Sequence, residues 1–170
     1  MTNPCDNSGG QAANYVLDVM ARKFLAGWKD RDGLTFNTPG GAIYGPKVML
    51  IDQDAGSGGD FLPYAFRRLG LGELIGTRTW GGLIGISANP DLIDGATLSV
   101  PYFRAYSPEG EWIVENEGVA PDYDVTLWPK DVIAGKDPQL EKAIELALDA
   151  LKKNPPKKDT RPAFPKRVSP

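Results

Sequence analysis

The chain of 170 residues is 41% apolar and 24% charged, proportions typical of one globular domain long enough to bury a core. Its net charge of -3 argues against nucleic-acid binding, which needs a basic surface. One cysteine and no histidine exclude an intrachain disulfide, a zinc site of histidine and cysteine, and a histidine base from this chain. The sequence also lacks a membrane-spanning segment and a signal-peptide pattern, so we expect a cytoplasmic protein.

The first half of the chain predicts two helices and two short strands. Apolar residues at helical spacing predict a helix over residues 11–26, and frequent glycine and proline predict a long loop over 28–45. A short apolar run with β-branched residues predicts a buried strand over 47–52. Helical spacing returns over 59–69, and a second short strand is predicted over 74–77.

The second half begins with a glycine-rich loop over residues 80–85. Two runs, 97–106 and 111–114, predict the strands of one hairpin, because a turn sequence joins them. A further short strand is predicted over 125–127. Helices that alternate with short strands indicate an α/β fold with a mostly parallel sheet.

A last helix is predicted over residues 138–153, with Asp137 as its N-cap and leucine, isoleucine and alanine side chains on a buried face. Residues 154–170 are rich in proline, lysine and arginine and cannot bury much surface. We therefore expect one domain over 1–153 and a disordered basic tail over 154–170.

The segment from Asp54 to Asp60 places one serine, Ser57, between the buried strand and the following helix. Glycines on both sides allow a tight turn, and the amino terminus of a helix offers free N–H groups to an anion. This arrangement suits a nucleophile. A serine that only caps the helix is the alternative.

Three segments carry a resemblance to a known family. They are Ala55-Gly56-Ser57-Gly58-Gly59-Asp60, Gly76-Thr77-Arg78-Thr79-Trp80-Gly81-Gly82 and Val114-Glu115-Asn116-Glu117-Gly118-Val119-Ala120-Pro121-Asp122. They resemble the catalytic core of tricorn protease, in the superfamily that includes the carboxy-terminal processing proteases. The resemblance implies a ClpP/crotonase-like spiral core and a serine hydrolase of the tricorn peptidase type. It would cleave peptide or small ester bonds without a cofactor and could form a homo-oligomer.

The resemblance also implies roles for individual residues. Ser57 matches the nucleophile, and the backbone N–H of Gly58 matches one donor of the oxyanion hole. The second donor lies in a glycine turn before a helix, which Asn7-Ser8-Gly9-Gly10 matches, with Gly9 as the donor. Glu115 matches the acidic member that supports the base.

The chain departs from the family at the base. Tricorn protease uses a histidine upstream of this core, and the processing proteases use a lysine where this chain has Gly82. We therefore expect a C-terminal fragment of a larger protease. Glu115 is a candidate base, with Glu117 and Asp60 as further candidates, although Asp60 also suits the positive end of a helix.

Two alternatives to a self-sufficient hydrolase remain open. The chain could be a truncated, catalytically weak core that binds peptides or self-associates, or a separate protein could supply the missing histidine. Trp80 could either line a substrate pocket or seal the core, and Cys5 is more simply an incidental cysteine than a reactive thiol.

Overall fold

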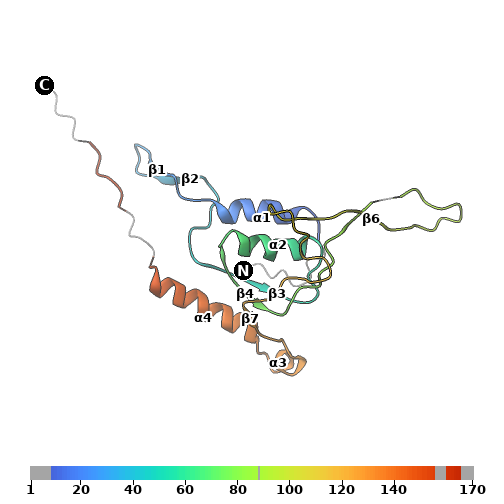
Figure 1. Cartoon of the computed structure of the whole chain (residues 1–170). Helices are drawn as coiled ribbons and strands as arrows, with labels where there is room; N and C mark the ends of the chain where they lie inside the picture. Colours follow the sequence, from blue (N-terminus) through green and yellow to red (C-terminus); the bar gives the residue numbers. More distant parts are fainter. Residues whose placement is uncertain (1–8, 88, 156–159, 166–170) are drawn as a thin grey trace.

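The structure is a computed structural model that describes residues 9–87, 89–155 and 160–165. Its elements in chain order are α1 (Ala12–Ala21), β1 (Ala26–Lys29), β2 (Thr35–Thr38), β3 (Lys47–Ile51), α2 (Gly58–Arg68), β4 (Gly72–Gly76), β5 (Gly85–Ser87), β6 (Val100–Phe103), β7 (Tyr123–Asp124), α3 (Pro129–Ile133) and α4 (Pro138–Lys153). Figure 1 shows α1 and α2 on one side of the central sheet, α4 on the other, and two hairpins that project from this body.

The central sheet is parallel and has the order β3-β4-β7. Lys47 pairs with Gly72 at one end of β3, and Ile51 pairs with Gly76 at the other. Parallel neighbours need a crossover between them, and α2 provides the crossover from β3 to β4. The predicted α/β class with a parallel sheet and packed helices is confirmed, whereas the narrower ClpP/crotonase-like assignment stays a prediction.

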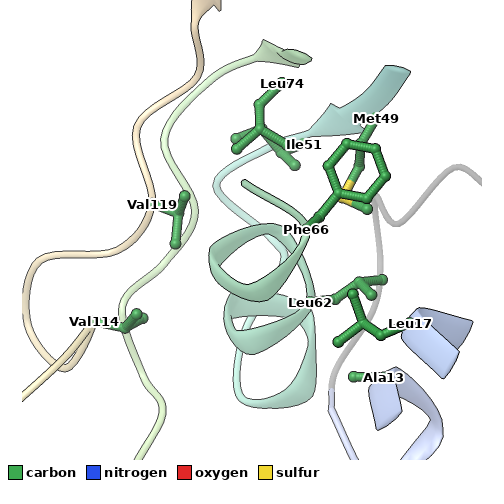
Figure 2. Packing of buried hydrophobic residues seen from close by; sticks show 9 residues of the cluster. All are labelled: Ala13, Leu17, Met49, Ile51, Leu62, Phe66, Leu74, Val114 and Val119. Atoms are coloured by element: carbon green, nitrogen blue, oxygen red, sulfur yellow. The ribbon is translucent and has the colours of Figure 1, made fainter. Parts of the chain in front are cut away.

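The core lies between the two helices α1 and α2 and the parallel sheet (Figure 2). Its buried apolar side chains come from both helices, from β3 and β4, and from the segment before β7. They are Ala13, Leu17, Met49, Ile51, Leu62, Phe66, Leu74, Val114 and Val119. Full burial of an aromatic or branched aliphatic side chain contributes about 1.5–3 kcal/mol, so this cluster holds α2 firmly against the sheet.

The predicted first helix was too long, and the predicted loop after it contains a hairpin. Helix α1 ends at Ala21, and β1 and β2 then pair antiparallel, with Trp28 opposite Phe36. The rings of these two residues are stacked with centroids 6.0 Å apart. The apolar residues after Ala21 thus serve strand pairing, which wins over their helical spacing because it supplies both hydrogen bonds and ring contacts.

The strand predicted over residues 97–106 pairs with a different strand from the one expected. Strand β6 pairs antiparallel with β5, so the glycine-rich loop leads into this projecting hairpin. The two runs expected to pair form no ladder of named strands in the described residues. They are joined by an isolated bridge between Tyr106 and Trp112 and by a hydrogen bond from the N–H of Ile113 to the carbonyl of Ala105 at 3.4 Å, and their turn is present, with the N–H of Gly110 bonded to the carbonyl of Ser107. The strand predicted over 125–127 is found two residues earlier, as β7.

Helix α4 has the predicted bounds and the predicted cap, since the N–H of Leu140 donates to the carboxylate of Asp137 at 2.9 Å. Its buried face was predicted only in part: Leu140, Ala147 and Leu151 are half-buried, but Ile144 and Leu148 are exposed. The fully buried residues are Gln139 and Ala143. Within the described ranges, no helix has the length and apolar character needed to cross a bilayer.

The expected division into a domain and a tail stays a prediction. Residues 160–165 form neither helix nor strand, and the Nζ of Lys29 lies 4.0 Å from the centre of the Phe164 ring. The statements on Cys5 and on the first two residues of the Asn7–Gly10 turn fall outside the described residues.

Candidate active site

Ser57 sits where the chain leaves β3 and enters α2, as the sequence predicts. It is the N-cap of α2 with φ 54° and ψ -116°, a conformation that L side chains rarely adopt. Such backbone strain costs about 1–3 kcal/mol and is found mainly at functional sites. The N–H of Ser57 donates to the carbonyl of Gly82 at 2.9 Å, and this bond holds the half-buried serine in place.

The glycines predicted to flank the oxyanion hole lie beside Ser57. A methyl group on Gly9 would come within 2.7 Å of the Ser57 hydroxyl oxygen and 3.2 Å of the Gly58 nitrogen. A methyl group on Gly58 would meet the Gly10 carbonyl oxygen at 2.4 Å. The backbone around the hydroxyl is therefore so tightly packed that neither position has room for a side chain.

The side chain of Asp60 binds the backbone of the glycine-rich loop. Its carboxylate is completely buried in the first turn of α2 and accepts hydrogen bonds from the N–H groups of Gly81 and Gly82, at 2.8 and 3.0 Å. Each carboxylate oxygen takes one of these bonds. Asp60 is thus a helix N-terminal acid, as expected, and it also links α2 to the loop that contacts Ser57.

The side chain of Glu115 binds the next two residues of the same loop. One of its carboxylate oxygens, Oε2, accepts hydrogen bonds from the N–H groups of Leu83 and Ile84, both at 2.7 Å. Its neighbours Val114 and Asn116 have positive φ values of 68° and 65°. Because Val114 is β-branched and strained in this region, the segment around Glu115 is held in a conformation it would not adopt by itself.

The three carboxylates considered as a base do not bond to the nucleophile position. Among the described residues, no carboxylate forms a hydrogen bond with the Ser57 hydroxyl; those of Asp60 and Glu115 bind the loop backbone instead. The part of the chain that the structure covers also contains no cluster of three histidine, cysteine, aspartate or glutamate residues that could hold a metal.

Trp80 neither seals the core nor lines the cavity at Ser57. The residue is 71% exposed, and its indole ring lies across the backbone of Gly56 and Gly82. A methyl group on Gly82 would come 2.4 Å from the ring. The position at which the processing proteases have a lysine is therefore covered by the Trp80 ring in this chain.

Ser57 lines a cavity of about 310 Å³. The start of α1 forms one wall, and Phe61, Leu83 and Phe103 provide apolar side chains. Arg104 is the charged residue of the lining. This space can hold a residue of a peptide with its carbonyl group beside Ser57.

Three features of the site could not be predicted from the sequence. Arg104 was predicted only as part of a strand, and the strand partner that brings Arg104 to Ser57 was predicted wrongly. Asp60 was considered only for its charge, because its position in the first helical turn gives no sign of the loop that its oxygens bind. The backbone strain at Val114 leaves no signal in the sequence either.

The comparisons with known proteins identify the family of the chain. The family model of peptidase family S41 matches residues 6–125. Tricorn protease homolog 1 of Streptomyces coelicolor is 40% identical over 161 residues, which cover 94% of this chain and 15% of that protein. Tricorn protease of Thermoplasma acidophilum is 36% identical over 146 residues, which cover 86% of this chain and 14% of that protein.

Among solved structures, the crystal structure of the tricorn protease matches with a TM-score of 0.80 and 36% identity, over 85% of this chain and 14% of that chain. This chain therefore spans a small part of the length of these relatives. Since the family model covers well over half of its residues and the fold agrees, the chain belongs to peptidase family S41.

Proposed function

We propose that the chain is a serine peptidase domain of the tricorn type that cleaves peptide bonds, and activated small esters, through Ser57. The observation that carries this proposal is the strained Ser57 at the start of α2, which lines a cavity and has its hydroxyl beside Gly9. Membership of a peptidase family supports the reaction class.

In the proposed reaction, Ser57 Oγ attacks the carbonyl carbon of the substrate, and its proton passes to a base. The carbonyl oxygen becomes an oxyanion that accepts hydrogen bonds from the N–H groups of Gly58 and Gly9. Each such donor is worth on the order of 10²–10³ in rate, because it stabilises charge that develops in the transition state. The leaving amine or alcohol then takes a proton, and water releases the acyl group from Ser57.

Glu115 has a positioning role in this proposal. Its carboxylate holds Leu83 and Ile84, and the loop in turn receives the Ser57 N–H at Gly82. These bonds favour an anchor for the loop over a direct base, because the carboxylate is bonded to the loop backbone and no hydrogen bond joins it to the Ser57 hydroxyl.

The general base is proposed to come from another polypeptide segment. The 170 residues contain no histidine, and none of the described carboxylates is bonded to the Ser57 hydroxyl. The same observation favours the second candidate function, a catalytically weak core that binds peptides or self-associates. Without a base, the oxyanion hole and binding alone leave roughly 10³–10⁴ over the uncatalysed rate in other serine proteases.

Hydrolysis of a short-chain p-nitrophenyl ester by the wild-type chain and by Ser57→Ala tests the proposal. We expect slow turnover by the wild type and only the buffer rate with Ser57→Ala. Equal rates for the two proteins would contradict it and favour the peptide-binding core. Urea unfolding of both proteins serves as the control, because a surface-directed hydroxyl should contribute little to the free energy of unfolding.

A further inference from the structure

A second and larger cavity, of about 620 Å³, lies directly beside the Ser57 cavity. The two share Phe61, Arg104 and Ala105 in their walls. These three residues therefore lie on the boundary between the two cavities, and a peptide whose carbonyl group lies at Ser57 would reach the larger cavity past them.

The walls of the larger cavity are mainly apolar. Helix α2 contributes Phe61, Tyr64 and Ala65 from successive turns, and Pro108 and Ile113 lie among the lining residues that follow β6. Apolar walls of this kind favour a large aliphatic or aromatic side chain, because burial of its surface is worth about 25 cal/mol per Å².

The charged side chains and the serine that line this cavity are already engaged, with one exception. Arg68 forms an ion pair with Glu109, and its hydrogen bond lowers the pKa of the Glu109 carboxyl. The Ser107 hydroxyl accepts from the N–H of Glu109 at 3.2 Å and from that of Glu111 at 3.4 Å. Neither Arg68 nor Ser107 is therefore poised for a ligand.

Arg104 is the exception. It lines both cavities, and its guanidinium carbon lies 4.7 Å from the centre of the Trp112 ring. No carboxylate pairs with it among the residues that the structure describes. An arginine stacked on an aromatic ring is held in orientation and keeps its N–H groups for a carboxylate.

We propose that the larger cavity is a substrate subsite for a large apolar side chain, and that Arg104 binds a carboxylate of the same peptide where the two cavities meet. The preferred substrates are thus peptides that carry an apolar residue and a carboxylate close together, near the bond that Ser57 attacks. The carboxylate comes either from an aspartate or glutamate side chain or from the end of the peptide. This inference rests on the proposed function, since it takes the Ser57 cavity as the place of the scissile bond.

Peptide binding to the full chain carrying Ser57→Ala tests the subsite without any need for turnover. The probes are fluorescently labelled hexapeptides with leucine or phenylalanine next to glutamate, the same peptides with glutamine, and both with a free or an amidated end. We expect the carboxylate peptide to bind about tenfold more tightly than its neutral version, with a difference that shrinks at high salt. A loss of affinity on replacing glutamate by glutamine identifies a side-chain carboxylate. A loss on amidation of the end identifies the terminal carboxylate.

Two further substitutions locate the site. Arg104→Gln should remove the preference for the carboxylate, whereas Arg31→Gln, at an exposed arginine in the turn between β1 and β2, should leave it unchanged. Ala65→Phe, which fills the cavity from α2, should weaken the binding of all peptides with a large apolar residue. Unfolding curves confirm that each variant folds, and the Arg104 comparison stands even if Ala65→Phe does not.

Absent binding, equal affinity for charged and neutral peptides, or equal effects of Arg104→Gln and Arg31→Gln would overturn the subsite. Its failure is distinguishable from that of the proposed function. If ester hydrolysis needs Ser57 but peptide charge has no effect on binding, the function stands and the subsite falls. If Arg104 governs binding while hydrolysis does not depend on Ser57, the subsite stands and the function falls.

Discussion

Asp60 and Glu115 hold the glycine-rich loop through four N–H groups, but they use their oxygens differently. Asp60 takes one bond on each oxygen, at 2.8 and 3.0 Å, so both oxygens are needed. Glu115 takes both of its bonds on Oε2, so one oxygen is enough. An amide keeps one acceptor oxygen and replaces the other by a donor. The two residues should therefore respond differently to the same chemical change.

We predict that Asp60→Asn lowers the free energy of unfolding by about 3 kcal/mol, because a buried N–H loses its acceptor and faces the amide donor. Glu115→Gln should cost only about 1 kcal/mol, since its oxygen can keep both bonds without the charge. Urea unfolding measures both values. If Glu115 were the base, Glu115→Gln would abolish Ser57-dependent ester hydrolysis; as an anchor, it should leave most of that activity. Equal losses of stability in the two variants would contradict the geometry.

At the scale of the element, the loop from Trp80 to Ile84 depends on close backbone packing. Gly81 has φ +83°, and a methyl group there would lie 2.6 Å from the nitrogen of Gly118. Gly110, in the turn after Ser107, has a similar φ of +86° but open space around it. The two glycines share a backbone conformation and differ in what surrounds them, so they form a matched pair.

We predict that Gly110→Ala costs about 1–2 kcal/mol, the penalty of the left-handed conformation alone. Gly81→Ala should cost clearly more, because the methyl group meets backbone atoms that cannot turn away, and it should also lower ester hydrolysis by displacing Gly82 from the Ser57 N–H. Thermal or urea unfolding and the ester assay compare the variants. The same cost at both positions would mean that the loop is free to move.

The elements predicted best were those with a local signal. The strand, turn and helix around Ser57, the strand β4 and helix α4 were recognised from an apolar run, helical spacing and the Asp137 cap. The hairpin of β1 and β2 was missed because its residues have no clear alternation, and that of β5 and β6 because its strands are farther apart in the sequence. The pairing of β6 with β5 brings Phe103 onto Gly85, a close approach that no sequence period encodes.

The candidate site residues, too, could be predicted only where a local motif names them. A resemblance named four residues, Ser57, Gly58, Gly9 and Glu115. In the structure the two glycines lie beside Ser57, and Glu115 binds the glycine-rich loop. The buried contacts of Asp60 and the position of Arg104 depend on how the loop and β6 lie in three dimensions. The contacts of Asp60 with the loop and the place of Arg104 in the site therefore come from the structure alone.

At the scale of the whole molecule, the two hairpins project from the core (Figure 1), and both carry exposed apolar side chains. Ile93 and Leu98, in the β5–β6 hairpin, are 109% and 59% exposed, and Leu34, between β1 and β2, is 71% exposed. Exposed apolar side chains that gather on a surface commonly drive association. We therefore expect the chain to self-associate, as the resemblance also implies.

We predict concentration-dependent association of the wild-type chain, measured by sedimentation velocity or by light scattering after gel filtration. The double variant Ile93→Gln with Leu98→Gln should shift the chain toward the monomer, because it removes apolar surface from the hairpin tip without touching the core. Ile144→Gln with Leu148→Gln is the matched control, since these two side chains are 41% and 51% exposed on α4, away from both hairpins. Association that survives the hairpin variant and disappears in the control would place the contact on α4, and a wild-type chain that stays monomeric at high concentration would contradict the prediction altogether.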